Sequence, residues 1–277
     1  MSESNFQELL LAVRAKNVTE VKRLIQVVRS VTSTSVDYSL FHIAAQNGDV
    51  DSIEAMTDFG ADVNISNKNG FTPVFIAAQN GHVDAINALS VLGANVNTPT
   101  SDGVSPVFIA AQQGHVETIK ALCALGADVH AAMPNGFSPV FIAAQQGHVE
   151  VIKTLYALGA DIHTPKEGGI TPLLVAASLG QTEMIKVLYK LGADMGVTAH
   201  KLDILGTARL RHNPKTVACI EKILSKMHSE CEYCGCSTKK LSRCGGCDKV
   251  HYCSIDCQKK DRKKHRDECR KSDNKGS

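Results

Sequence analysis

The sequence contains no tryptophan, and aromatic residues make up only 5% of its 277 residues. Aromatic side chains usually dominate a large globular core, whereas a stack of small repeats can be built from small aliphatic residues. No stretch approaches the roughly 18 consecutive apolar residues that a membrane-spanning helix needs, so we expect no membrane segment. Residues 1–5 have neither a basic start nor an apolar run, and we therefore expect no secretory signal.

Cysteine is nearly absent from the first 230 residues. Eight of the 10 cysteines lie between Cys231 and Cys269, and only Cys123 and Cys219 lie elsewhere. Residues 231–277 also hold 13 Lys and Arg against 7 Asp and Glu, although the whole chain has a formal charge of only +2. Secreted disulfide proteins and metal sites both contain such clusters. Without a secretory signal, and with histidine inside the pattern, metal binding is favoured.

An Ala-Ala pair recurs every 33 residues, which predicts stacked structural repeats. The last four units end with Leu-Gly-Ala followed by Asp or Asn. One pair of short helices cannot bury its apolar side alone, so successive units must stack. The pairs begin at Ala44, Ala77, Ala110, Ala143 and Ala176, and the closing stretches begin at Leu92, Leu125, Leu158 and Leu191.

One unit illustrates the expected local structure. Pro73 suits the start of a first helix, where its missing N–H costs nothing, and Gly81 ends this helix. Gly93 is placed to end a second helix in a left-handed conformation. The second helix should bury one face, because its apolar residues recur at three-residue spacing, at Val83, Ile86, Leu89 and Leu92.

This pattern resembles the ankyrin repeat, whose signature is Thr-Pro-Leu-His followed by Gly-Ala-Asp-Val-Asn after the second helix. The resemblance covers residues 37–197 and implies a mainly α solenoid of helix pairs with short hairpin turns. The signature histidine is kept only at His42. Its replacements either form an apolar ladder between repeats or an exposed aromatic strip for a partner; they are Phe75, Phe108, Phe141 and Leu174.

Both ends of the repeat array are atypical, as terminal repeats are where one face meets water. Residues 1–36 lack Thr-Pro but keep apolar spacing at Val18, Val21 and Leu24, which predicts a capping helix pair. We expect five repeats over 37–197 and a degenerate C-terminal capping repeat over 198–228. The apolar side of that last unit is predicted at Ile220, Ile223 and Leu224.

Two groups of residues are candidates for partner binding. Ankyrin proteins commonly bind partners through turn tips and the concave face, and this resemblance points to tip residues such as Lys68 and Met133. Tips also vary simply because nothing constrains them. A row of amides, each both donor and acceptor, suits an extended peptide backbone, although surface solubility explains it too. The row is Gln79, Asn80, Gln112, Gln113, Gln145 and Gln146, preceded by Gln46 and Asn47.

The C-terminal cysteines and one histidine form four local pairs, which suit two tetrahedral zinc sites. Two pairs are separated by two residues and fit tight knuckles. The other two are separated by three residues, as on one face of a helix. The eight predicted ligands are Cys231, Cys234, Cys244, Cys247, Cys253, Cys257, His265 and Cys269.

The order and spacing of these ligands resemble the MYND finger over residues 231–269, followed by a tail at 270–277 that we expect to be disordered. The resemblance implies interleaved sites, with Cys231, Cys234, Cys253 and Cys257 on one zinc ion and the remaining four ligands on the other. Cys236 is an alternative to Cys234 in a slipped pair, but Cys234 fits the family spacing. We interpret His251 as a surface residue, and Cys123 and Cys219 as core residues.

The finger departs from its family where peptides dock. MYND fingers usually read Cys-Gln-x-x-Asp-Trp after the sixth ligand, and the Gln and Trp help form the surface for proline-rich peptides. Here Gln258 is kept and Arg262 replaces the Trp. Arg262 either shifts the preference toward acidic ligands or covers the second zinc site with its aliphatic stem. The basic run from Lys259 to Lys271 largely offsets the charge of the metal sites, so we expect no direct nucleic-acid binding.

Some protein families join a MYND finger to a SET methyltransferase domain, but repeats and finger occupy nearly all of this chain. Both zinc sites would be filled by protein ligands, which leaves no open position for a catalytic water. A RING-type ubiquitin ligase would need a different ligand order. We therefore expect a monomeric, non-enzymatic adaptor with protein or peptide partners, in the cytoplasm, the nucleus or both. The alternative is a nuclear transcriptional regulator that recruits corepressors through the finger.

Overall fold

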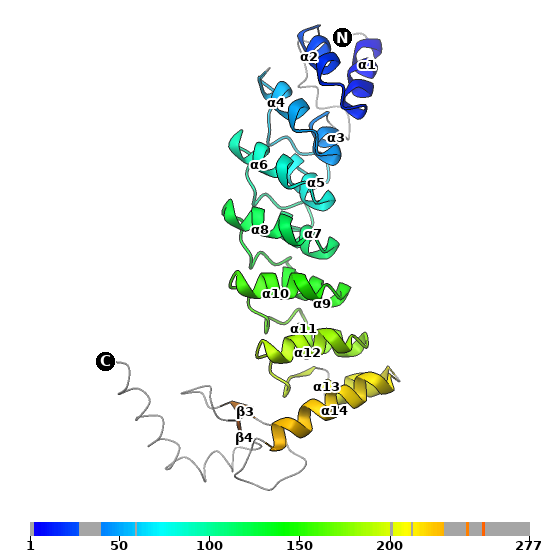
Figure 1. The fold of residues 1–277 in the computed structure, drawn as a ribbon, viewed down its shortest axis with the longest axis vertical. Coiled ribbons are helices and arrows are strands. Elements are labelled where there is room, and N and C mark those ends of the chain that lie inside the picture. The colour runs from blue at the N-terminus through cyan, green and yellow to red at the C-terminus, as the bar shows by residue number, and fades with distance from the viewer. Residues whose placement is uncertain are drawn as a thin grey trace, which may run out of the picture. The chain divides into compact units, whose positions relative to one another are not determined.

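The computed structural model describes residues 3–27, 40–58, 60–199, 202–211, 213–229, 242–243 and 251–252. The chain divides into two compact units, Met1–Glu167 (unit 1) and Gly168–Ser277 (unit 2). Unit 1 is a row of helix pairs (Figure 1). Its helices are α1 (Glu3–Arg14), α2 (Val18–Val27), α3 (Leu40–Asn47), α4 (Val50–Asp58), α5 (Pro73–Asn80), α6 (Val83–Val91), α7 (Pro106–Gln113), α8 (Val116–Ala124), α9 (Pro139–Gln146) and α10 (Val149–Ala157).

The described residues of unit 2 form two further helix pairs and two short antiparallel strand pairs. Thr198 of β1 lies opposite Asp203 of β2, and Ser242 of β3 lies opposite Tyr252 of β4. In the described part of the chain, every helix is too short or too polar to cross a bilayer. The elements of unit 2 are α11 (Pro172–Ser178), α12 (Thr182–Lys190), β1 (Thr198–Ala199), β2 (Leu202–Asp203), α13 (Ile204–Leu210), α14 (Pro214–Ser229), β3 (Ser242–Arg243) and β4 (His251–Tyr252).

The first helix of each central repeat begins and ends as the sequence predicts. In α5, the hydroxyl of Thr72 accepts a hydrogen bond from the N–H of Phe75, and Pro73 is the first helical residue. Gly81 follows the helix in the left-handed conformation, with φ of 78°. Because a residue with a Cβ rarely adopts this conformation, glycine ends the helix at low cost. α7 and α9 have the same caps.

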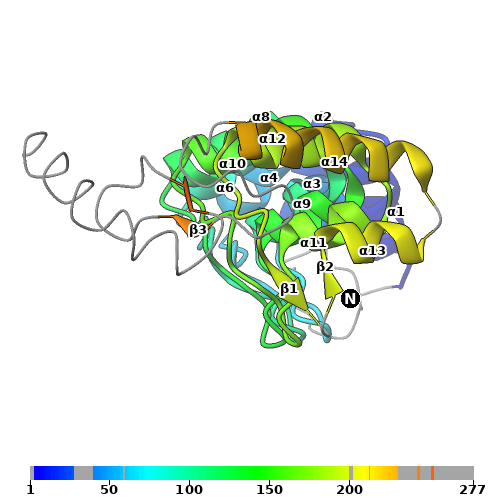
Figure 2. The same cartoon turned by 90° about the horizontal axis from the view of Figure 1, so that it is seen from below.

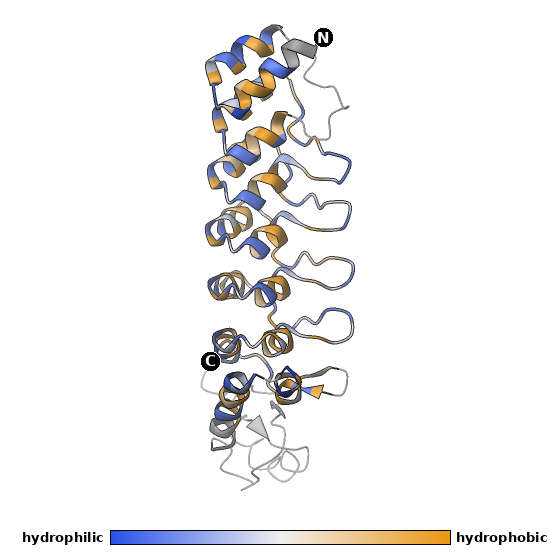
Figure 3. Cartoon of the chain, turned by 90° about the vertical axis from the view of Figure 1, so that its right-hand side faces the viewer, coloured by the Kyte–Doolittle hydropathy of each residue, from blue (hydrophilic) through white to orange (hydrophobic). Residues whose placement is uncertain are grey.

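The first helices α3, α5, α7 and α9 form one column, and the second helices α4, α6, α8 and α10 form another (Figure 1). The first helices pack against one another more extensively than the second helices do. The small Ala pairs permit this close approach, since Ala77, Ala110 and Ala143 are completely buried. The loops between repeats project to the same side of unit 1 (Figure 2) and are less hydrophobic than the helices (Figure 3).

The phenylalanines that replace the signature histidine are buried. Phe75, Phe108 and Phe141 are 3%, 4% and 1% exposed, and the equivalent Leu174 of unit 2 is 2% exposed. The hypothesis of an exposed aromatic strip is therefore wrong. These rings lie in the first turn of the first helix, and their burial shows that they contribute to packing; the ring of Phe75 stacks on that of Phe71, with 4.9 Å between the centroids.

The second helices bury a narrower face. In α6, Ile86 and Leu89 are completely buried, whereas Val83 and Leu92 are half-buried. The helix ends at Val91, so Leu92 is the cap residue, and Gly93 follows with φ of 95°. The left-handed glycine predicted here is present, one residue beyond the cap itself.

A helix pair precedes the repeats of unit 1 in the sequence, and another follows α12 in unit 2. α1 packs against α2 and α3, and α2 packs against α4, so this pair continues the two columns of unit 1 without a Thr-Pro start. In unit 2, α13 packs against α11 and α14, and α14 packs against α12. Ile220 and Ile223 of α14 are buried and Leu224 is half-buried.

Candidate functional site

The predicted amide row occupies the last two positions of three successive first helices. These positions are equivalent in α5, α7 and α9, so the amides recur once per repeat along unit 1. The first amide of each pair is half-buried, and the second is exposed; the half-buried residues are Gln79, Gln112 and Gln145, and the exposed residues are Asn80, Gln113 and Gln146.

Some of these amides serve the fold itself. Nδ2 of Asn80 donates to the carbonyl oxygen of Ile76 on the same helix, at 2.8 Å. Nδ2 of Asn47, the equivalent residue of α3, donates to the carbonyl oxygen of Val13 on α1, at 3.3 Å. The row is therefore not a uniform set of side chains facing a partner, and Gln113 and Gln146 are its best candidates for outside contacts.

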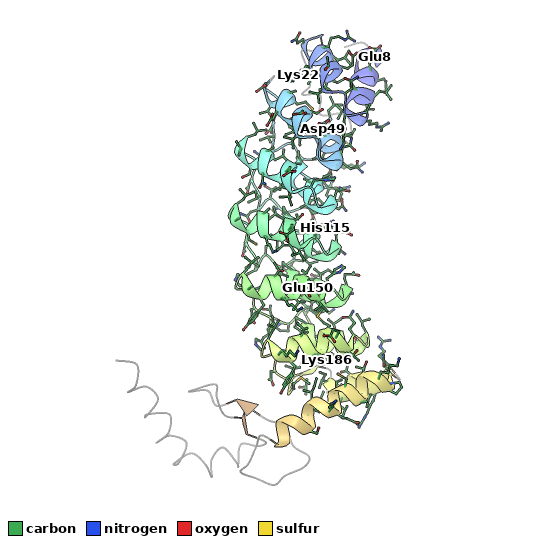
Figure 4. All side chains as sticks on the ribbon, in the orientation of Figure 1. Glu8, Lys22, Asp49, His115, Glu150 and Lys186 are labelled. Carbon is green, nitrogen blue, oxygen red and sulfur yellow. The ribbon has the colours of Figure 1, made fainter. Side chains whose placement is uncertain are left out.

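Three histidines that the sequence analysis did not single out tie successive repeats together. Nε2 of His82 lies 2.8 Å from the carbonyl oxygen of Gln46, and His115 and His148 make the same contact with Gln79 and Gln112, at 3.1 and 2.9 Å. A carbonyl only accepts, so each imidazole donates. His115 is labelled in Figure 4, just before α8. These contacts could have been anticipated from the sequence, because a Gly-His pair recurs every 33 residues.

The glycine that ends the first helix of the preceding repeat makes room for each of these rings. A Cβ on Gly48 would lie 2.8 Å from the ring of His82, and a Cβ on Gly114 would lie 3.0 Å from the ring of His148. The glycine therefore permits both the left-handed helix end and the close approach of the neighbouring repeat.

Asparagines join the loops of successive repeats. Nδ2 of Asn64 donates to the carbonyl oxygen of Gly93, at 3.2 Å, and its Oδ1 accepts from the N–H of Asn95, at 2.8 Å. Asn97 makes the same pair of contacts one repeat further on, with Gly126 as its acceptor at 3.0 Å. These loops are therefore fixed to one another beside the helix ends.

The two predicted tip residues have different surroundings. Lys68 is exposed. Met133 is half-buried, and its backbone closes the turn: its N–H donates to Phe137 at 2.9 Å and its carbonyl accepts from Gly136 at 2.8 Å. Nζ of Lys166 lies 4.8 Å from the ring centroid of Phe137, which places a cation beside this tip. Lys68 is therefore the better candidate for contacting a partner.

Two titratable side chains of unit 1 are perturbed by burial. His42 is 1% exposed, and its Nε2 lies 2.6 Å from the carbonyl oxygen of Phe71. Burial lowers the pKa of His42 and outweighs this hydrogen bond, which acts in the opposite direction. Burial, with a smaller contribution from Asp128, raises the pKa of the Cys123 thiol and disfavours the reactive thiolate. Cys123 and Cys219 are half-buried rather than core residues.

The eight predicted zinc ligands lie outside the described residues, as do Cys236, Gln258, Arg262 and the predicted tail at 270–277. Of this region, the structure describes only the strand pair β3–β4; the backbone of His251 belongs to β4. In the sequence, Cys244 directly follows β3 and Cys253 directly follows β4. The donor set of seven cysteines and one histidine fits zinc, which favours sulfur and nitrogen ligands in tetrahedral geometry.

Among the described residues, no group of His, Cys, Asp and Glu side chains is arranged to hold a metal.

The repeats match a known structure along most of its length. The crystal structure of the human ASB11 ankyrin repeat domain is 28% identical to this chain, with a TM-score of 0.60, and the match covers 67% of this chain and 83% of that one.

Curated relatives match only a short segment. Tudor domain-containing protein 1 of Oryzias latipes is 49% identical over 43 residues, which are 16% of this chain and 4% of that protein. Human N-lysine methyltransferase SMYD2 is 44% identical over 41 residues, 15% of this chain and 10% of that protein. The chain thus spans a small fraction of either relative.

Two family models match the chain. The model for ankyrin repeats (3 copies) matches residues 9–100, 41–133, 88–166 and 108–199, which together include most of the sequence. The model for the MYND finger matches residues 231–269, the range predicted from the ligand spacing. Both are protein-interaction domains, and a MYND finger binds zinc. Because the ankyrin-repeat model matches most of its length, the chain belongs to the ankyrin-repeat family, and it carries a MYND finger at residues 231–269.

Proposed function

We propose that this chain is a non-enzymatic adaptor whose repeats bind one protein while its finger binds a short peptide of another. One observation carries the proposal for the repeats. Equivalent positions of consecutive repeats carry exposed polar side chains, Gln113 and Gln146, while the Ala pairs of the same helices are buried in the core. Each of these two exposed amides can both donate and accept a hydrogen bond, as the backbone of an extended peptide does.

This surface is tested by affinity capture from cell extract with the full chain as bait. The double variant Gln113→Ala/Gln146→Ala changes two exposed side chains, so its unfolding curve should match that of the wild type. Proteins recovered by the wild type and lost with this variant would be partners of the amide row. The matched control is Asn87→Ala/Lys120→Ala, which alters two exposed residues on second helices. If both double variants lose the same proteins, or neither loses any, the amide row is not the binding surface.

For the finger, we propose two zinc ions with interleaved ligands and a peptide groove formed by Gln258 and Arg262. When bound, zinc supplies a structural cross-link and no chemistry. The ligand thiolates would otherwise repel one another, so metal binding and folding of this segment are coupled. Arg262 in place of the family's Trp offers a hydrated cation instead of an apolar plane, which favours peptides containing Asp or Glu.

The groove is tested with a peptide array that contains neutral and acidic proline-rich sequences. The wild type should prefer the acidic peptides, and Arg262→Trp should shift binding toward neutral ones by about tenfold, or roughly 1.4 kcal/mol. Lys264→Trp is the matched control, because it replaces a nearby cation outside the family's docking positions. If the wild type binds neutral peptides as tightly as Arg262→Trp does, the altered preference is wrong.

A further inference from the structure

A strip of exposed apolar side chains follows the C-terminal ends of the second helices in unit 1. Val91 is 86% exposed, and the equivalent residues Ala124 and Ala157 of the next two repeats are exposed as well. Beside them, Tyr156 is 45% and Leu158 is 39% exposed. We call these five residues, which lie at the C-terminal ends of α6, α8 and α10 or directly after them, the apolar strip. Single exposed apolar residues are ordinary, but a row that recurs at one position per repeat indicates a contact surface.

The helix ends at this strip are close together and uncovered. Asn64 and Asn97 bridge the residues that follow successive helices, since their amides donate to the carbonyl oxygens of Gly93 and Gly126. A Cβ placed on Gly93, Gly126 or Gly159 would meet no described atom within 4 Å. Open space therefore adjoins the strip at three consecutive repeats.

This edge of unit 1 is also negatively charged. α4, α6, α8 and α10 have no basic residue in their last turns, so the negative ends of four helix dipoles are not offset there. Asp128 and Asp161, which follow α8 and α10 by a few residues, are exposed. Residues 40–167 as a whole hold twelve Asp and Glu against four Lys and Arg, although Asp51, Asp84, Glu117 and Glu150 lie at the opposite, N-terminal ends of the second helices. Lys120 and Lys153 are paired with glutamates of their own helices, at 2.7 and 2.6 Å.

We infer that the apolar strip is a docking site for a basic amphipathic helix of a protein partner. Packed helices lie about 8–10 Å apart, so the strip presents one apolar position roughly every 10 Å. Seven residues of an α-helix rise about 10.5 Å. A partner helix that crosses α6, α8 and α10 with an apolar residue every seven positions matches this spacing. Lys and Arg on its flanks then face the helix C-termini and the aspartates. This site is separate from the amide row, so neither proposal depends on the other.

The test uses the full chain and synthetic helical peptides. The first peptide has Leu at heptad spacing and Lys elsewhere on its polar face. The second keeps every Lys and replaces Leu by Ala, and the third keeps Leu and replaces Lys by Glu. Fluorescence anisotropy should show binding of the first peptide, with at least tenfold weaker binding of the other two. No binding of the first peptide, or equal binding of the Ala peptide, would overturn the inference.

Two double variants then show where on the chain the peptide binds. Val91→Lys/Ala157→Lys adds two cations at exposed positions of the strip, and we expect at least tenfold weaker binding of the basic peptide. Ser66→Lys/Ala132→Lys adds the same charge at two exposed positions of the loops between repeats and should change the affinity less than about twofold. Thermal unfolding checks that both variants stay folded. Equal losses in the two variants would contradict docking at the strip. Sedimentation that shows a dimer of the wild type, dissociated by Val91→Lys/Ala157→Lys, would instead identify a second copy as the occupant.

Discussion

The repeats of residues 40–167 and the cysteine-rich residues 231–269 differ in how much apolar surface they have to bury. In α5, every residue from Pro73 to Ala78 is buried, and the same six positions are buried in α7 and α9. Residues 231–269 contain only three large aliphatic side chains, Leu241, Val250 and Ile255, and no Ala, Met or Phe. So small an apolar content cannot offset the conformational entropy lost on folding. We therefore infer that packing stabilises the repeats, and we expect the folding of the finger to depend on metal.

Of the changes proposed here, zinc removal should have the most different effects on the structure of the two regions. The purified protein should contain two zinc ions, and Cys244→Ser should remove one of them. A chelator should unfold residues 231–269 while the helical circular dichroism of the repeats persists, because metal binding supplies the folding free energy of so small a domain. Cys123→Ser, which changes a half-buried thiol of α8, is the control and should leave the zinc content unchanged. Elemental analysis that gives one ion or none for the wild type would contradict the two-site assignment.

A pair of glycine substitutions tests the packing of the repeats. Gly126→Val places a side chain at φ of 89° in open space, so only backbone strain of about 1–2 kcal/mol is expected. Gly114→Val adds to similar strain a close contact with the ring of His148, which must shift and so weaken its hydrogen bond to the carbonyl of Gln112. Weakening that hydrogen bond costs up to about 1 kcal/mol more. Urea unfolding measures both variants, and equal losses of stability would show that the histidine contacts do not matter.

The pH dependence of stability should distinguish the first repeat from the three that follow. The pKa of His42 is lowered by burial, so the unfolded chain binds a proton more readily than the folded chain. Stability should be level above the ordinary histidine pKa of about 6.5 and should fall as the pH drops below it. In His42→Phe, which copies Phe75, Phe108 and Phe141, this part of the pH dependence should disappear. The carbonyl of Phe71 keeps a hydrogen bond from the N–H of Asn67. Identical pH profiles for wild type and variant would contradict this assignment.

The smallest effects are expected at the loop tips. Lys68→Ala should change stability by less than about 0.5 kcal/mol, because Lys68 is exposed. Met133→Ala should cost about 1 kcal/mol, because part of its side chain is buried. Thermal unfolding of the two variants measures the difference. If Met133→Ala is as stable as Lys68→Ala, the tip of that repeat contributes no packing.

Much of the fold followed from local signals. Thr-Pro or Ser-Pro starts, glycine ends and three-residue apolar spacing act within a few residues, so α5, α7 and α9 could be predicted with their caps, and α6, α8 and α10 could be predicted without theirs. The contacts between repeats that shape the candidate surface could not be predicted from such signals. The partners of His82, His115 and His148 lie 36 residues earlier in the sequence. Periodicity indicates which face of a helix is apolar, but it does not say which polar side chain reaches across to the preceding repeat.

The sequence by itself determined that this protein is a stack of 33-residue helix pairs with a zinc-binding finger, because a repeated pattern and a ligand spacing are properties of the chain alone. Only the tertiary structure decided that Phe75, Phe108 and Phe141 are buried, that Asn80 bonds its own helix and that Val91 stands 86% exposed. The reason is that burial depends on how closely the next repeat approaches, and that distance is set by many side chains acting together. Residues with the same apolar character can therefore lie in the core or on the surface.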